Sequence, residues 1–205
     1  MPAFHRRKKS AGIVARIVAC YGELELLLAF CMGSALASTR KPHPTHNRGS
    51  HRHRFQKAAL KQLFSVRGDS DRIKIAKKSM HEAYFKSGLK SEYINTMGAL
   101  GDCLNIRNLF AHCSWGQSKK QGLFFVNLEE RAKKKGQLRF RFRHASSKTL
   151  RELEDYFWLT FQWLDYFSNE FCSRNALMLN HSFSIPQKIP VMKPYMKMFP
   201  HRRPH

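Results

Sequence analysis

The stretch that decides the fold is Leu104-Asn105-Ile106-Arg107-Asn108-Leu109-Phe110-Ala111-His112-Cys113-Ser114-Trp115. Its apolar residues recur at spacings that gather on one side of a helix, which predicts the end of a core helix. Arg107, Asn108 and His112 interrupt this apolar pattern, and a buried guanidinium needs a partner or a ligand. Arg107 and His112 are about 140° apart on a helix of 3.6 residues per turn. They can therefore meet only if the helix loosens near His112, or if the site is shared with another chain.

The composition is strongly basic. The chain has 205 residues, and 37 Lys and Arg against 14 Asp and Glu give a formal charge of +23. This length is enough for one helical domain with a core, and the charge favours RNA or DNA as a partner over an anionic membrane surface. Five scattered cysteines without a CxxC pair indicate reduced thiols in a cytoplasmic protein. No uncharged apolar run reaches the roughly 18 residues of a membrane span, so we expect no membrane insertion.

The N-terminal region allows two interpretations. Residues 1–9 are basic, and the apolar stretch after them ends in Ser34-Ala35-Leu36-Ala37-Ser38, which resembles a signal peptide with its cleavage site. Charged residues interrupt that stretch, however, and its apolar residues have helical spacing. We therefore favour a core helix that Ser10 caps and that runs to about Ala37. The interrupting residues are Arg16, Glu23 and Glu25.

A basic loop and four further helices are expected next. Pro, Gly and Ser among basic residues predict a loop over 38–54. Its histidines lack acidic or thiolate neighbours, so contact with phosphate is favoured there over a metal site. These histidines are His43, His46, His51 and His53. The helices are predicted over 55–66, 69–86, from Ser91-Glu92 through the opening stretch until Gly116, and from Ser146 or Ser147 to about Asn175.

Two strands are expected before the last helix, over residues 122–128 and 137–143. The second strand alternates, with Leu138, Phe140 and Phe142 on one face and Arg139, Arg141 and Arg143 on the other. A charged turn joins the strands, so we expect a β-hairpin on the helical body. Its exposed arginine face, with Arg52 and Arg54 of the basic loop, can hold a phosphate backbone. The alternative is a solvated edge protected by charge, and the two interpretations stay open.

These patterns predict an all-α fold, a bundle of four to five helices with a small β-hairpin inserted before the last helix. The expected organisation is a basic arm over 1–9, a helical domain over 10–175 with the insertion at 122–143, and a Pro-rich basic tail over 176–205. The tail has no periodicity and is expected to be poorly ordered. Aromatic residues on more than one side of the last helix favour packing in a bundle and allow contact with a partner chain.

The segment Arg107-Asn108-Leu109-Phe110-Ala111-His112 resembles the signature of the HEPN superfamily, an Arg, a polar residue and a following His at a helix end. The resemblance covers roughly residues 10–175 and implies a HEPN-like bundle. Many members of this family are metal-independent endoribonucleases whose two motifs meet in a dimer. The resemblance therefore implies RNA cleavage by a homodimer without a cofactor. It is also consistent with the toxin of a toxin–antitoxin or antiphage system, which would have an antitoxin partner.

The three motif residues suit that chemistry. By the resemblance, His112 is a general base or acid, because imidazole exchanges protons near neutral pH. Arg107 is the clamp on the phosphorane, since a guanidinium donates to two phosphate oxygens at once, and Asn108 orients the phosphate or the Arg. Two alternatives stay open. Some family members bind RNA or nucleotides without cleavage, and Arg107 can instead be a structural arginine paired with Asp102 or Glu25.

Overall fold

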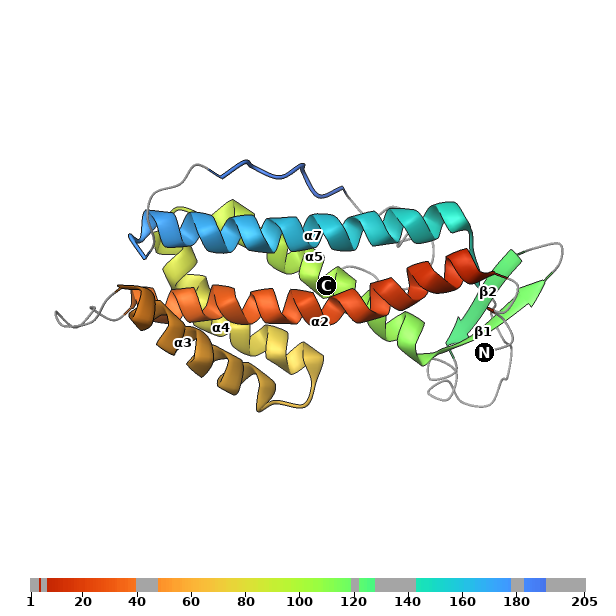
Figure 1. Ribbon diagram of the computed structural model, residues 1–205, viewed down its shortest axis with the longest axis horizontal. Coiled ribbons are helices and arrows are strands. Elements are labelled where there is room, and N and C mark those ends of the chain that lie inside the picture. Colours follow the sequence, from red (N-terminus) through yellow and green to blue (C-terminus); the bar gives the residue numbers. More distant parts are fainter. Residues whose placement is uncertain are drawn as a thin grey trace. The chain divides into compact units, whose positions relative to one another are not determined.

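A computed structural model describes Phe4 and residues 7–39, 48–118, 122–127, 143–177 and 183–190. Within these ranges five helices and three short strands follow one another along the chain (Figure 1). The elements are α2 (Lys8–Ser38), α3 (Arg48–Phe64), α4 (Asp69–Lys86), α5 (Lys90–His112), β1 (Cys113–Ser118), β2 (Gly122–Asn127), β3 (Arg143–Ala145) and α7 (Ser147–Arg174). The predicted fold class is confirmed, since the chain is mostly helical with a small antiparallel sheet before the last helix.

Three of the predicted helix boundaries change. Helix α3 begins at Arg48, so the loop predicted over 38–54 is too long. The run of basic residues has no apolar periodicity, yet arginine is a good helix former. Helix α5 ends at His112, three residues before the predicted end, because Cys113 enters β1. Ser10 lies inside α2 rather than at its cap, and its Oγ is 3.4 Å from the Oγ of Ser147.

The chain divides into two compact units. The sheet unit contains residues 1–20, 105–157 and 190–205, and the bundle unit contains residues 21–104 and 158–189. Helices α2, α5 and α7 each contribute residues to both units. The motif that resembles the HEPN signature belongs to the sheet unit.

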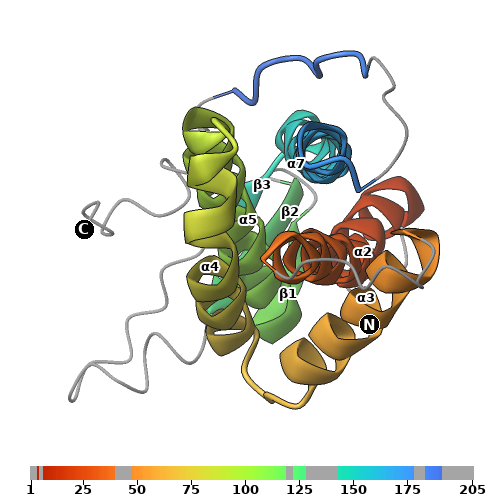
Figure 2. The same cartoon turned by 90° about the vertical axis from the view of Figure 1, so that its left-hand side faces the viewer.

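Helix α2 is the central helix of the bundle unit. Its five consecutive residues 31–35 are all buried, which requires neighbours on every side of the helix. The hydroxyl of Tyr84 in α4 donates to the carbonyl of Cys31 (3.2 Å), and the thiol of Cys31 donates to the carbonyl of Leu164 in α7 (3.6 Å). On the α3 side, a Cβ added to Gly33 would lie 2.8 Å from the Cα of Gln56. Figure 2 views α2 and α7 nearly end-on, with α3 beside α2.

Aromatic stacking joins α4 to α7 within the bundle unit. The ring of Tyr84 stacks on those of Phe167 and Phe171, with centroids 4.0 Å apart in both pairs. All three side chains are fully buried, as the helical spacing of the sequence predicts. Trp158, by contrast, is 58% exposed and stacks on Phe161 at 5.5 Å, so α7 does present a second apolar side.

The carboxylate of Glu25 belongs to a half-buried ion-pair network. Arg72 Nη1 donates to both carboxylate oxygens of Glu25 and to Asp69 Oδ1, each at 3.2 Å. Its Nε donates to the carbonyl of Val66 (2.9 Å), so one guanidinium links α2 to the turn before α4. Glu25 is therefore a partner of Arg72.

The sheet of the sheet unit is antiparallel, in the order β1-β2-β3. Strand β2 pairs with β1, a strand that was not predicted because its residues were expected in a helix end and loop. It also pairs with β3, which begins at Arg143 of the second predicted strand. Of the second predicted strand, only Arg143 lies among the described residues, at the start of β3. A strand over 113–118 lacks apolar alternation, and its assignment depends on the partner that it finds in β2.

Four of the five cysteines are buried, and all five are reduced thiols. Burial raises the pKa of the Cys31 and Cys113 thiols to about 12, and it raises the pKa of Cys103 further. Such thiols are poor nucleophiles at neutral pH, because the thiolate is the reactive form. Cys20 is half-buried.

Residues 183–190 form no regular secondary structure, and the indole of Trp163 in α7 donates to the carbonyl of Gln187 (2.8 Å). This part of the predicted tail is therefore bound to α7, and residues 178–182 and 191–205 lie outside the described residues. Among the helices that the structure describes, none combines the length and apolarity needed to cross a bilayer.

Candidate functional site

The segment Arg107–His112 forms the last turn and a half of α5. Leu109 and Phe110 of this segment and Ile106 just before it are buried, at 4%, 3% and 1% exposure. Arg107 and Asn108 are half-buried on the flank of this apolar face, and His112 is exposed at the end of the helix. The apolar residues therefore anchor the segment, while its polar residues lie at or near the protein surface.

Arg107 and Asn108 are brought together by the structure. Arg107 Nη1 donates to Asn108 Oδ1 at 2.8 Å, within hydrogen-bond distance. Consecutive helical residues do not normally face each other, so the long arginine side chain bends over its neighbour. A guanidinium has five N–H donors in a planar fork, and this bond uses one of them. The amide oxygen of Asn108 thus holds one N–H of the Arg107 fork.

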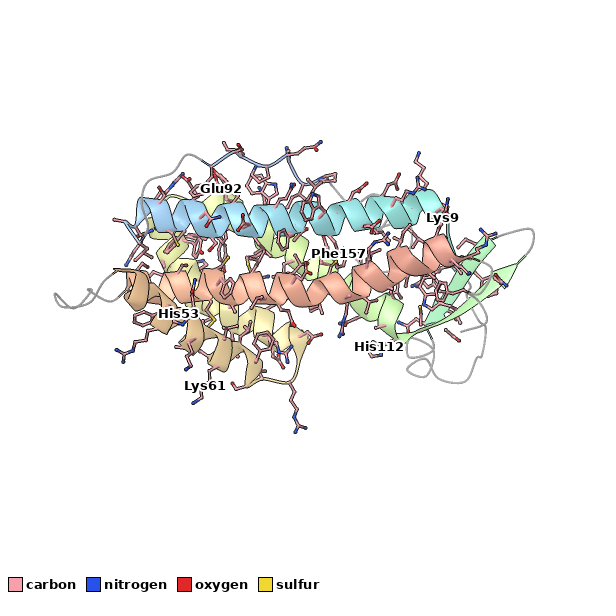
Figure 3. All side chains as sticks on the ribbon, in the orientation of Figure 1. Lys9, His53, Lys61, Glu92, His112 and Phe157 are labelled. Atoms are coloured by element: carbon pink, nitrogen blue, oxygen red, sulfur yellow. The ribbon has the colours of Figure 1, made fainter. Side chains whose placement is uncertain are left out.

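His112 occupies the C-terminal turn of α5, where the partial negative charge of the helix end favours a cation. In Figure 3 its labelled side chain lies at the end of α5, where the chain enters β1. The segment is α-helical through His112, so the loosening that would bring His112 toward Arg107 on one chain does not occur. A regular helix keeps the two residues about 140° apart around its axis.

The end of α5 is held by a tryptophan that sequence reasoning did not assign a role. The indole Nε1 of Trp115 in β1 donates to the carbonyl of Phe110 (3.3 Å), one of the carbonyls left open at a helix end. The Trp115 ring also contacts Phe110 and Phe125, with centroids 5.2 and 5.1 Å apart. This aromatic cluster attaches the end of α5 to β1 and β2. In the sequence, the signal for this contact was the tryptophan itself, which stands three residues after His112.

The five predicted RNA-binding arginines do not form one face in the described structure. Arg54 is exposed on α3, in the bundle unit. Arg143 lies opposite Phe125 in the sheet register and is half-buried, not exposed as predicted, because residues opposite each other in a sheet share a face. Arg139, Arg141 and the side chain of Arg52 lie outside the described residues.

Metal binding finds no support in the part of the chain that is described. No group of three or more His, Cys, Asp or Glu side chains in these ranges is placed to hold a metal ion. Of the histidines in the predicted basic loop, His53 has a described side chain, and it is exposed on α3.

Comparisons with known proteins add no information about this site. No protein-family model matches the chain, and searches of the curated proteins and of the solved structures find no significant match. The fold and the site thus define a broad class: a helical protein in which one helix ends in a segment that carries Arg107, Asn108 and His112. Its relation to the HEPN superfamily stays a prediction from the residues of the motif.

Proposed function

We propose that this protein is a metal-independent endoribonuclease whose active centre is built from Arg107, Asn108 and His112 of two copies of the chain. The observation that carries the proposal is the end of α5, where Arg107 donates to Asn108 and His112 is exposed one turn later. The net charge of +23 adds the electrostatic attraction that a polyanionic substrate requires.

The need for two copies follows from the regular helix. An exposed His112 and a half-buried Arg107 on different sides of one α5 cannot easily act on the same phosphate. When two such helix ends face each other, the histidine of one copy can approach the arginine of the other. Oligomers with two-fold symmetry bring identical surface patches together in this way.

The reaction is an attack of the ribose 2′-oxygen on the adjacent phosphorus. The imidazole of His112 takes the 2′-hydroxyl proton as the O2′–P bond forms, and the P–O5′ bond breaks. The partner's His112, in its protonated form, gives a proton to the departing 5′-oxygen. The Arg107 guanidinium donates to the non-bridging oxygens, where negative charge grows in the transition state. The products are a 2′,3′-cyclic phosphate and a 5′-hydroxyl, and no metal takes part.

Cleavage of RNA in EDTA is the first test. Purified protein should cut single-stranded RNA in excess EDTA, and His112→Ala should abolish cutting. Arg107→Lys keeps the charge but loses the fork, so we expect activity to fall by about 10²–10³-fold. His81→Ala is the matched control, because His81 is also an exposed histidine but lies on α4, in the bundle unit. Full activity of His112→Ala would refute the assigned role.

A mixing experiment tests the composite site. His112→Ala and Arg107→Ala proteins, each inactive alone, should regain part of the wild-type activity after they are denatured together and refolded. One chain of the mixed dimer then supplies the histidine and the other supplies the arginine. A site contained in one chain would give no recovery, because neither chain has both groups.

The second candidate is an RNA-binding module without cleavage, favoured by the same charge of +23. It predicts salt-dependent binding to RNA and intact RNA at every protein concentration. A toxin of a toxin–antitoxin or antiphage system is a version of the first candidate. Growth arrest on expression of the wild-type chain, absent for His112→Ala, would support that version.

A further inference from the structure

Helix α3 has a charge composition unlike that of the helix next to it. Its 17 residues, RGSHRHRFQKAALKQLF, contain five Arg or Lys and no Asp or Glu. In α4, three acidic residues stand among the lysines and arginines. Like charges three or four positions apart destabilise a helix by about 0.2–0.5 kcal/mol per pair, so α3 forms against its own repulsion.

Three of these cations form a stripe on the outer side of α3, here called the α3 stripe: Arg54, Lys57 and Lys61. They are spaced by three and four residues, which brings them to one side of the helix, and all three are exposed. The opposite side carries Ala59 and Leu63, both fully buried. Figure 3 shows the Lys61 side chain projecting from the side of α3 that faces away from α2.

The lysines of α4 differ in having acidic partners. Lys74 is paired with Asp71 at 2.8 Å, and Lys86 with Glu82 at 2.6 Å. Arg54, Lys57 and Lys61 make no ion pair with any described residue. Within the described part of the chain, the α3 stripe is thus a row of cations without an acidic partner, which suits a bound polyanion.

We propose that the α3 stripe binds the phosphodiester backbone of a nucleic acid without reading its bases. The three residues span roughly 10 Å at about 1.5 Å per residue. One strand of a duplex advances about 3.4 Å per phosphate, so this length corresponds to about three phosphates. Bound phosphates would release counterions and relieve the repulsion within α3. Only the choice of RNA as ligand rests on the proposed function, because DNA has the same backbone charge.

An anionic membrane is the less suitable partner. A helix that lies in a membrane interface inserts an apolar face into the lipid. In α3 that face is buried against the rest of the bundle unit, since Ala59 and Leu63 are fully covered. On the exposed side the three cations are accompanied by one large apolar residue, Phe64, at the C-terminal end of α3, which is 45% exposed. A single aromatic ring at one end is less than the apolar face that an interfacial helix inserts.

Salt-dependent binding of an RNA that cannot be cut tests this surface. The probe is a single-stranded RNA with methylated 2′-hydroxyls, and the variant is Arg54→Gln/Lys57→Gln/Lys61→Gln in the full chain. Glutamine keeps the helix propensity and removes the charge. Each lost phosphate contact lowers the slope of log K against log salt by about 0.7, so we expect a slope smaller by about 2. Affinity at 0.1 M salt should then fall by about tenfold to a hundredfold.

The matched control is Lys74→Gln/Lys77→Gln/Lys78→Gln in α4, which removes the same charge from three exposed lysines of the same unit. We expect it to change the affinity for RNA much less, with circular dichroism showing that both variants keep their helices. Equal losses in the two variants would overturn the proposal, since net charge alone would then explain binding. Loss of binding to phosphatidylserine vesicles with RNA binding unchanged would also overturn it.

The outcome is separable from that of the proposed nuclease. If the wild-type protein never cuts RNA, the proposed function fails, while the comparison of the two triple variants still decides the role of the α3 stripe. If the protein does cut, the α3 variant should have a higher KM and an unchanged kcat, because the stripe contributes to substrate binding and contains none of the three proposed reacting residues. A change confined to kcat would contradict a role in binding.

Discussion

Gly33→Ala is expected to destabilise the bundle unit although alanine is the better helix former. The new Cβ would lie 2.8 Å from the Cα of Gln56 and 3.0 Å from its nitrogen, which are backbone atoms of α3. They cannot move aside like a flexible side chain, so α2 and α3 would have to separate. Overpacking of this kind costs about 1–3 kcal/mol. The higher helix propensity of alanine offsets up to about 1 kcal/mol of that cost.

Gly22→Ala provides the control on the same helix. A Cβ at Gly22 would meet no atom within 4 Å, and the residue is exposed, so only the gain in helix propensity remains. The propensity term cancels between the two variants, and their difference of about 1–3 kcal/mol measures the contact with α3. Urea unfolding followed by far-UV circular dichroism gives this difference. In thermal unfolding it corresponds to about 2–4 °C per kcal/mol for a chain of this size.

The close approach of α2 and α3 would be refuted if Gly33→Ala were as stable as Gly22→Ala. Such a result would mean that the two helices can move apart without losing other contacts. A Gly33→Ser variant, whose side chain is larger, should be no more stable than Gly33→Ala. The order Gly22→Ala, wild type, Gly33→Ala in decreasing stability is the specific expectation.

Two other predictions concern the ion pairs and the thiols. Arg72→Met should lower the free energy of unfolding by about 3 kcal/mol in urea titrations, because it leaves the buried Glu25 carboxylate without this cation. Lys74→Met, which breaks the exposed pair with Asp71, should leave that free energy unchanged. At pH 8, a thiol reagent should modify the half-buried Cys20 first in the native protein. Burial raises the pKa of most of the other thiols, so their reactive thiolate form is scarce. In urea all five cysteines should react. Rapid native modification of more than one thiol would contradict this burial.

The helices that bury a periodic face were predictable from the sequence. In α4 the stripe Ile73, Ala76, Met80 and Tyr84 is buried as its spacing predicts. The seam residues of α7 are buried in the same way: Leu150, Leu153, Phe157, Leu164, Phe167 and Phe171. A helix satisfies its backbone hydrogen bonds within its own segment, so local spacing is enough to place both the helix and its buried face.

The candidate site was predictable only in part. Arg107, Asn108 and His112 could be chosen from the sequence because polar residues in an apolar helix end require a function or a partner. The hydrogen bond from Arg107 to Asn108 and the indole of Trp115 on the helix end could not be predicted. The first depends on the side-chain conformation of Arg107, and the second on the turn of the chain from α5 into β1.

The sequence by itself determined the helical class, the buried faces of the helices, the basic charge and the residues of the motif. Tertiary structure alone decided that Cys113–Ser118 is a strand, that Glu25 pairs with Arg72, and that Gln187 is bound to α7. The physical reason is the same in each case. A strand, an ion pair and an irregular segment are completed by groups from residues far away in the sequence, whereas a helix is completed by residues a single turn away.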